Sequence, residues 1–229
     1  KFLLSNKNVF LVNNSKKGTE EYSAWLKLKK NKPKITFNIF DFKKIKKIKD
    51  KRDSEKVTIG MVSRLAPEKN IEYFIEIANR LINEDKKYHF KLYGEGYLKR
   101  SLINKIERFN LKKNFTLMGV KKDIISEMQK MDVCFLTSKY EGTPNVLLEA
   151  QSVGTPVITT DVGGTSECIV KNYSGYLING KNLDEDLIKI KKLLKNENFL
   201  KKRNVSFIKN KLKKFSSKEV INKIILLYA

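Results

Sequence analysis

The sequence predicts an α/β domain of the Rossmann-like, doubly wound type, and two observations predict it. Between residues 57 and 180, six short apolar segments alternate with segments of helical periodicity. This alternation is typical of βαβ units and of a parallel sheet covered on both faces. Glycine and polar clusters follow the segments, at the strand ends where such sheets bind ligands. With 229 residues and 41% hydrophobic content, the chain is long enough to bury this core.

The predicted strands are apolar, rich in β-branched or aromatic residues, and bounded by turn residues. They are KVTIGMV (56–62), HFKLYGEG (89–96, ending in a glycine turn), FTLMG (115–119), VCFLTS (133–138), TPVITTD (155–161) and SGYLIN (174–179). The helix predicted over 71–82 has apolar residues at helical spacing along one face. Further helices are predicted over 97–109, 123–131 and about 144–153.

Both ends of the chain differ from this unit. Residues 1–42 are expected to be the end of a preceding α/β domain with its linker, built from a strand (9–13), a helix (20–30) and a second strand (34–40). A chain that opens on Lys1 within a strand-like pattern is expected to be a piece of a longer one. Residues 43–56 are a basic linker, and residues 181–229 are basic helices.

The last helix is expected to leave an apolar face partly exposed. The residues of that face are Val220, Ile221, Ile224, Ile225 and Leu227. Packing against a preceding domain is the favoured role for it, and peripheral contact with an anionic lipid surface is the alternative. No apolar run approaches the 18 residues of a spanning helix, and the start does not resemble a signal peptide.

Charge and cysteines limit the function classes. The formal net charge is +23, and most of it lies in the flanks. Residues 57–180 carry 17 basic and 14 acidic residues, against 17 and 6 before them and 14 and 5 after them. Nucleic-acid binding is one reading of this charge, but aromatic residues are not interleaved with the basic runs, so we expect no nucleic-acid partner. Cys134 and Cys168 are expected to be buried free thiols, and a cytoplasmic location follows.

Two cations follow the first predicted strand in GMVSRLAPEKN (60–70). Arg64 and Lys69 lie beside a helix N-terminus, which is a combination suited to a diphosphate. The alternative is that Lys69 is solvated in the first helical turn and that Arg64 pairs with Glu68. Neither reading excludes the other from the sequence alone.

Glycines end three further strands. Gly94 allows close approach of a ligand or a tight turn, and Gly119 with Val120 forms either a surface for a base or a turn. Gly163 and Gly164 follow the fifth strand, where a missing Cβ allows backbone to approach a pyrophosphate or a sugar.

The stretch EGTPNVLLEA (141–150) places two carboxylates around a helix start. We predict Thr143 as the N-cap and Pro144 as the first helical residue. Glu141 would then lie in the loop, and Glu149 inside the helix with its side chain leaning toward the same end. Carboxylates accept hydrogen bonds from vicinal hydroxyls, and the first helix amides are free to hold phosphate. The alternative without a ligand is a helix start with two solvated acids.

Taken together, these stretches resemble the donor site of glycosyltransferase family 4, which contains retaining enzymes of the GT-B fold. EGTPNVLLEAQSVGTPVITTDVGGTSE, GMVSRLAPEKN, LYGEG and MGV occur in the family's order over about residues 57–180. KITFNIFD resembles the family's linker but carries Ile39 and Phe40 where glycine and isoleucine are expected.

The resemblance implies a role for each matching residue. Arg64 and Lys69 would neutralise the diphosphate, Glu149 would bind ribose, and Glu141 would contact the donor sugar. The other donor-binding candidates are Gly60, Gly94, Gly119, Val120, Gly142, Thr143, Pro144, Asn145, Val146, Gly163 and Gly164. It implies a nucleotide sugar as substrate, UDP-sugar first, a glycan or lipid-linked acceptor, and no cofactor or metal.

The resemblance also implies a hexosyl or N-acetylhexosaminyl transferase of the bacterial surface-polysaccharide type. Most of the acceptor domain would lie outside this chain, so we expect the chain to bind donor and to turn over poorly or not at all. The alternatives are a non-catalytic sugar-nucleotide binder, a sugar-phosphate enzyme such as an epimerase, and a basic nucleic-acid-binding protein. Salt-sensitive binding to unrelated DNA would favour the last of these.

Overall fold

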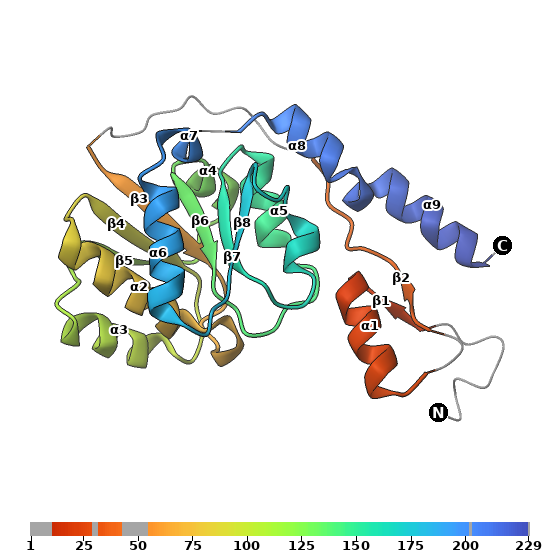
Figure 1. The fold of residues 1–229 in the computed structure, drawn as a ribbon, viewed down its shortest axis with the longest axis horizontal. Coiled ribbons are helices and arrows are strands. Elements are labelled where there is room, and N and C mark those ends of the chain that lie inside the picture. Colours follow the sequence, from red (N-terminus) through yellow and green to blue (C-terminus); the bar gives the residue numbers. More distant parts are fainter. Residues whose placement is uncertain (1–10, 29–31, 43–54, 202, 229) are drawn as a thin grey trace.

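The computed structural model describes residues 11–28, 32–42, 55–201 and 203–228. Its centre is a parallel six-stranded sheet, with strands in the order β5-β4-β3-β6-β7-β8 (Figure 1). The strands are β3 (Val57–Val62), β4 (Tyr88–Tyr93), β5 (Phe115–Gly119), β6 (Val133–Leu136), β7 (Val157–Thr160) and β8 (Gly175–Ile178). The six predicted strands are confirmed. The order reverses between β3 and β6, which are hydrogen-bonded neighbours, and such a switch point is where doubly wound sheets bind ligands.

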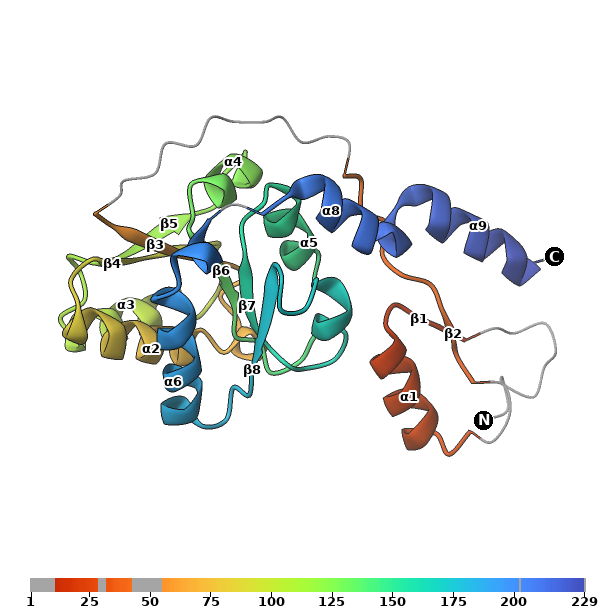
Figure 2. The same ribbon diagram turned by 45° about the horizontal axis from the view of Figure 1, so that its top comes forward.

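Helices cover both faces of the sheet (Figures 1 and 2). One core joins the sheet to α2 (Ile71–Glu84), α3 (Lys99–Arg108) and α6 (Leu183–Leu194). The second core joins it to α4 (Ile124–Gln129), α5 (Asn145–Ser152) and α8 (Val205–Lys211). The predicted doubly wound architecture is therefore confirmed, and the buried residues of α2 match the predicted apolar face, as Phe74, Ile75 and Ala78 illustrate.

A buried amide fixes α5, the helix that carries Glu149. The Gln151 side chain donates to the carbonyl oxygens of Leu147 and Cys168, each at 2.7 Å. Its Oε1 accepts from the amide of Val170 at 3.1 Å and from the Ser174 hydroxyl at 2.6 Å. All the hydrogen-bonding groups of this fully buried side chain are engaged, which holds the helix rigidly against the loop before β8. Cys134 and Cys168 are buried thiols outside any disulfide, as predicted.

The N-terminal segment folds as β1 (Val12–Asn13), α1 (Lys16–Trp25) and β2 (Lys34–Ile35), with the two strands parallel. The predicted helix over 20–30 is wrong at both ends. It begins earlier because Ser15 caps it, accepting from the amide of Gly18 at 3.0 Å. It ends before Lys27, whose φ of 52° is left-handed. The strand predicted over 34–40 ends at Ile35, and the strand predicted over 9–13 lies partly outside the described residues.

The C-terminal segment continues through α7 (Glu197–Leu200), α8, the 3-10 helix η4 (Lys213–Phe215) and α9 (Ser217–Tyr228). It contacts the segment after β2: the amide of Phe40 donates to the Phe215 carbonyl at 2.7 Å, and the rings of Phe37 and Phe215 lie 4.9 Å apart. Of the predicted apolar face, Val220 is buried, whereas Ile221 and Ile225 are exposed. Most of the predicted basic linker, 43–56, lies outside the described residues. Within the described residues, no helix has both the length and the hydropathy needed to cross a membrane.

Candidate functional site

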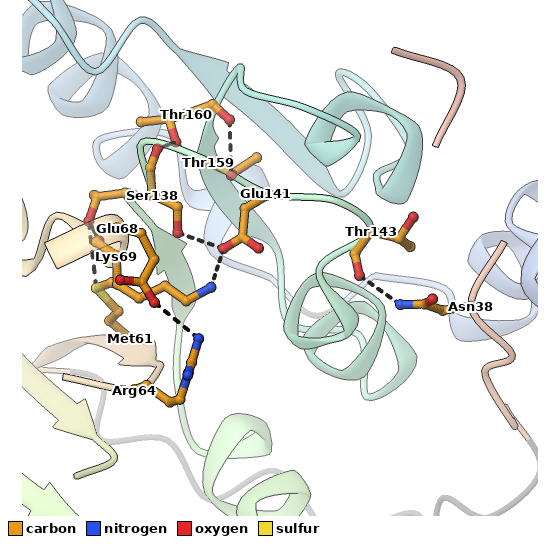
Figure 3. A network of polar contacts seen from close by, with 11 residues as sticks. Asn38, Met61, Arg64, Glu68, Lys69, Ser138, Glu141, Thr143, Thr159 and Thr160 are labelled. Carbon is orange, nitrogen blue, oxygen red and sulfur yellow. Dashed lines mark hydrogen bonds and ion pairs between the residues drawn. The ribbon is translucent and has the colours of Figure 1, made fainter. Parts of the chain in front are cut away.

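A largely buried ion pair lies at the carboxyl edge of the sheet, beside the switch point. Lys69 ends the 3-10 helix η2 (Pro67–Lys69), which follows β3, and its Nζ donates to Glu141 Oε1 at 2.6 Å. The two side chains are only 17% and 10% exposed. The Ser138 hydroxyl donates to the same carboxylate oxygen at 2.6 Å (Figure 3). Lys69 is therefore not the solvated first-turn residue of the alternative reading.

Backbone contacts hold this pair in place. The Thr137 hydroxyl, after β6, donates to the carbonyl oxygens of Lys69 and Asn70 at 3.2 and 3.1 Å. The amide of Lys139 donates to the Glu68 carbonyl at 2.8 Å. The loops after β3 and β6 are thus joined on both sides of the pair, so its geometry is preorganised.

Arg64 is placed as the alternative reading has it. Its guanidinium pairs with Glu68 at 3.0 Å and is 79% exposed (Figure 3). An exposed i,i+4 pair contributes little to stability, roughly 0.3–0.5 kcal/mol. Arg64 is consequently free to leave Glu68 at small cost, and its place in the site stays a prediction.

Gly60 and Gly94 have packing reasons for being glycine. Gly60 is buried in the middle of β3, and a Cβ there would lie 2.1 Å from Met131 Sδ. A Cβ at Gly60 would thus point at Met131, which follows α4, and the prediction that Gly60 binds donor stays a prediction. Gly94 has φ of +131°, and its Cβ would lie 1.9 Å from the Ser63 carbonyl oxygen. Gly94 therefore allows the loops after β3 and β4 to touch.

Gly119 and Val120 end β5 next to these loops. The Gly119 carbonyl accepts from the amide of Gly94 at 2.9 Å, and Gly119 itself has φ of +65°. Val120 is 73% exposed. Gly119 thus forms a tight turn, which leaves the apolar Val120 side chain exposed at the carboxyl edge of the sheet.

The loop before α5 contacts the N-terminal segment. The prediction of Thr143 as N-cap is wrong, because its hydroxyl donates to the Asn14 carbonyl instead of accepting from a helix amide. Pro144 is the N-cap residue rather than the first helical one, and helix α5 begins at Asn145. The Asn38 side chain donates to the Thr143 carbonyl at 3.1 Å (Figure 3). It also donates to Asn145 Oδ1 at 3.3 Å.

The glycine pair after β7 packs against the same loop. Gly163 has φ of +49°, and its Cβ would lie 1.7 Å from the Glu141 carbonyl oxygen. The amide of Gly164 donates to the Gly142 carbonyl at 2.9 Å, and its Cβ would meet Ser15. The close approach predicted for a ligand is occupied here by protein backbone. Gly142 itself and Val146, which is half-buried, stay at the rim.

Glu149 is half-buried in α5, and its carboxylate has no hydrogen-bond or ion-pair partner among the described residues. Loss of hydration raises the pKa of its carboxyl above the usual value. A partly buried acid without a partner costs stability, and active and binding sites are where such costs are found.

Glu149→Gln is expected to stabilise the chain at neutral pH. Because its pKa is raised on folding, the native state holds this proton more tightly than the unfolded state. The free-energy cost of folding with the Glu149 carboxylate charged is absent below pH 4.5, the ordinary pKa, and grows as the pH rises through the folded pKa. Urea unfolding at pH 7 should give Glu149→Gln a higher midpoint than the unmodified chain, and at pH 4 an equal one. A lower midpoint for the variant at pH 7 would show that Glu149 has a stabilising partner.

The structure brings Lys69, Glu141 and the loop over 142–146 together at one rim, and it places Gly163 and Gly164 behind them. Gly60 lies apart, inside the sheet. Sequence reasoning missed Ser138, Asn14 and Asn38, which contact the site loop. Ser138 is the last residue of a predicted strand, which is a usable signal; the two asparagines are brought close only by the fold.

A doubly wound sheet with a lysine–carboxylate pair at its switch-point edge defines an α/β protein with a polar ligand site. Residues 41–214 match the family model described as "Glycosyl transferases group 1", and the chain belongs to this family.

Curated relatives include bacterial polysaccharide enzymes. The chain is 32% identical over 181 residues to the Vi polysaccharide biosynthesis protein VipC/TviE of Salmonella typhi, covering 73% of this chain and 31% of that protein. It is 30% identical over 193 residues to poly(ribitol-phosphate) alpha-N-acetylglucosaminyltransferase of Staphylococcus aureus, covering 84% and 39%. The chain thus spans between about a third and two fifths of the length of these relatives.

Solved structures share the fold. A TarM mutant of S. aureus, in complex with fondaparinux, alpha-GlcNAc-glycerol and UDP, matches with a TM-score of 0.83 at 24% identity, over 96% of this chain and 43% of that one. HepE of Anabaena in complex with UDP matches with a TM-score of 0.80 at 18% identity, over 96% and 63%. At these identities the likeness establishes the GT-B type of fold.

Proposed function

We propose that this chain forms the donor-binding part of a retaining glycosyltransferase that uses a UDP-sugar. The observation that carries the proposal is the buried Lys69–Glu141 pair, with the unpartnered Glu149 in the helix that follows the same loop. Family membership and the UDP present in the structures of similar fold support this choice of nucleotide.

The pair suggests how donor binding proceeds. Lys69 turns from Glu141 to the diphosphate, whose charge it neutralises together with Arg64. Glu141 then accepts hydrogen bonds from hydroxyls of the donor sugar, and Ser138 keeps its carboxylate oriented. Glu149 accepts from the ribose hydroxyls, for which its unsatisfied carboxylate is suited. The exposed Val120 lies against the base.

The same groups favour transfer. As the sugar–phosphate bond breaks, positive charge grows at the anomeric carbon and negative charge on the leaving diphosphate. Lys69, Arg64 and the first amides of α5 stabilise that leaving charge, and stabilisation of this kind is usually the largest contribution to such catalysis. Side-chain cations do this without a metal or cofactor in our proposal. Retention of anomeric configuration is proposed from the family resemblance.

The acceptor is proposed to be a glycan or a lipid-linked glycan at the cytoplasmic side of a membrane. One relative in Escherichia coli is named for transfer to a GlcNAc-diphosphoundecaprenol, and it is 39% identical over 128 residues, 54% of this chain and 33% of that protein. The exposed Ile221, Ile225 and Leu226 of α9, with nearby lysines, are the candidate peripheral contact.

Two carboxylate variants test the division of roles by calorimetry. Glu149→Ala should weaken the binding of UDP and of UDP-N-acetylglucosamine equally, by about 10-fold or more, since a lost hydrogen bond to a charged group is worth about 1.5–3 kcal/mol. Glu141→Ala should weaken the sugar nucleotide more than UDP. Glu127→Ala, which removes an acid on α4, is the control and should change neither affinity. Equal losses for both ligands in both site variants would refute the assignment.

A further inference from the structure

We infer that a groove between α1 and the Glu141–Gly142 loop is a subsite for a neutral sugar ring of the acceptor. The groove has a volume of about 480 Å³ and runs along one face of α1, with Glu21, Tyr22 and Trp25 on that face and Asn14, Glu141 and Gly142 beside it. This volume falls in the roughly 300–1,000 Å³ range of small-molecule sites. The inference rests on the proposed function and names the partner of the same site.

An uncovered aromatic pair forms the apolar part of the groove. Trp25 is 72% exposed and Tyr22 is 46% exposed, three residues apart on the helix. Their ring centroids lie 5.4 Å apart at 62°, so one ring braces the other edge to face. Sugar rings present an apolar face of C–H groups, which packs on such an aromatic surface while the hydroxyls point outward.

The polar part of the groove decides the charge of the ligand. Glu21, Glu141 and Asn14 bring hydrogen-bond acceptors for hydroxyls to the groove, and no lysine or arginine is among the described residues that line it. Glu141 is already paired with Lys69, and the described lining residues offer no cation to a phosphate group. A neutral polyhydroxyl ligand fits both the charge and the aromatic surface.

The groove is held to the donor site by defined contacts. The carboxylate of Glu167 accepts from the amides of Lys16 and Lys17 at 3.1 and 3.2 Å, across the N-terminus of α1. Lys17 also pairs with Asp161 at 3.8 Å. These contacts fix α1 on the rim of the sheet, and Figure 2 shows α1 lying beside the domain at its carboxyl edge.

Glu141 connects the two sites. It lines the groove and also pairs with Lys69, where the donor sugar is proposed to lie. A sugar ring on Trp25 and Tyr22 would therefore have its hydroxyls on the side of the donor sugar. That is the position an acceptor needs for transfer.

The test uses Trp25 as reporter, because it is the only tryptophan of the chain. Methyl glycosides of N-acetylglucosamine, galactose and glucose are titrated into the chain while its emission is recorded. At least one should produce a saturable change with a Kd in the millimolar range, as a single ring of this size allows. Tyr22→Ala and Glu21→Ala should each weaken glycoside binding at least fivefold. Glu20→Ala, which removes the neighbouring acid outside the groove, should leave it unchanged.

UDP calorimetry on the same samples separates the two proposals. Saturable glycoside binding with the expected variant pattern, together with UDP binding, supports the acceptor subsite. UDP binding with no glycoside response overturns the subsite and leaves the proposed function standing. Equal weakening by Glu20→Ala and Glu21→Ala overturns the subsite as well. Glycoside binding without UDP binding overturns the groove's role as acceptor site, since no donor would lie beside it.

Discussion

Replacing Lys69 by alanine should weaken UDP binding by about 10- to 100-fold, because a charge-assisted hydrogen bond to phosphate is worth roughly 1.5–3 kcal/mol. In an intact transferase the loss of one such group should reduce the rate by about 10²–10³. The variant also leaves the buried Glu141 carboxylate without its cation, which should lower the free energy of unfolding by about 1–3 kcal/mol.

The two roles of Lys69 are separable with a double variant. Lys69→Ala with Glu141→Ala removes the unpaired charge, so it should recover much of the lost stability but none of the lost UDP affinity. Lys130→Ala is the matched control: its pair with Glu127 has the same 2.6 Å distance, but Lys130 is 57% exposed. It should cost less than about 1 kcal/mol and leave UDP binding intact. UDP affinity within twofold of the original in Lys69→Ala would contradict the donor-site assignment.

Gly163→Ala should have the largest effect on the structure of the site. A Cβ at this residue would lie 1.7 Å from the Glu141 carbonyl oxygen, which is backbone and cannot move without its loop, and the φ of +49° is itself unfavourable for alanine. We expect a loss of about 3 kcal/mol or more in unfolding free energy, and loss of UDP binding through displacement of Glu141.

Gly119→Ala provides the comparison for this variant in urea unfolding. It has a similar φ of +65°, but the nearest atom to its Cβ is the Glu95 side-chain oxygen at 3.4 Å. It should therefore show the conformational cost alone, about 1–2 kcal/mol. Equal destabilisation by both variants would mean that the contact between Gly163 and the Glu141 loop is unimportant.

The strands and helices over 57–180 were predictable because burial on both faces of a parallel sheet sets their apolar pattern. Ile59 and Met61 in β3 and Phe74 in α2 are fully buried, and their spacing in the sequence already indicates it. Family membership was likewise predictable, since the motifs occur in order within the matched residues 41–214.

Tertiary contacts account for what the sequence did not predict. Two amides in the first turn of α1 donate to Glu167, about 150 residues away, and the Thr143 hydroxyl donates to Asn14, 129 residues away, instead of capping α5. The local sequence around these residues gives no indication of partners so distant in the chain. A glycine in the sequence indicates that a Cβ is excluded, but the sequence does not say which group excludes it. For Gly60 and Gly163 the excluding group is part of the protein.

Calorimetric titration of the unmodified chain with UDP, GDP and ADP tests the proposed donor site most directly. Because Lys69, Glu141 and Glu149 all lie within this chain, we predict saturable binding of UDP, weaker binding of GDP and ADP, and a loss of UDP affinity of at least 10-fold in Lys69→Ala. No binding of any nucleotide, or UDP binding of equal strength in Lys69→Ala, would contradict it.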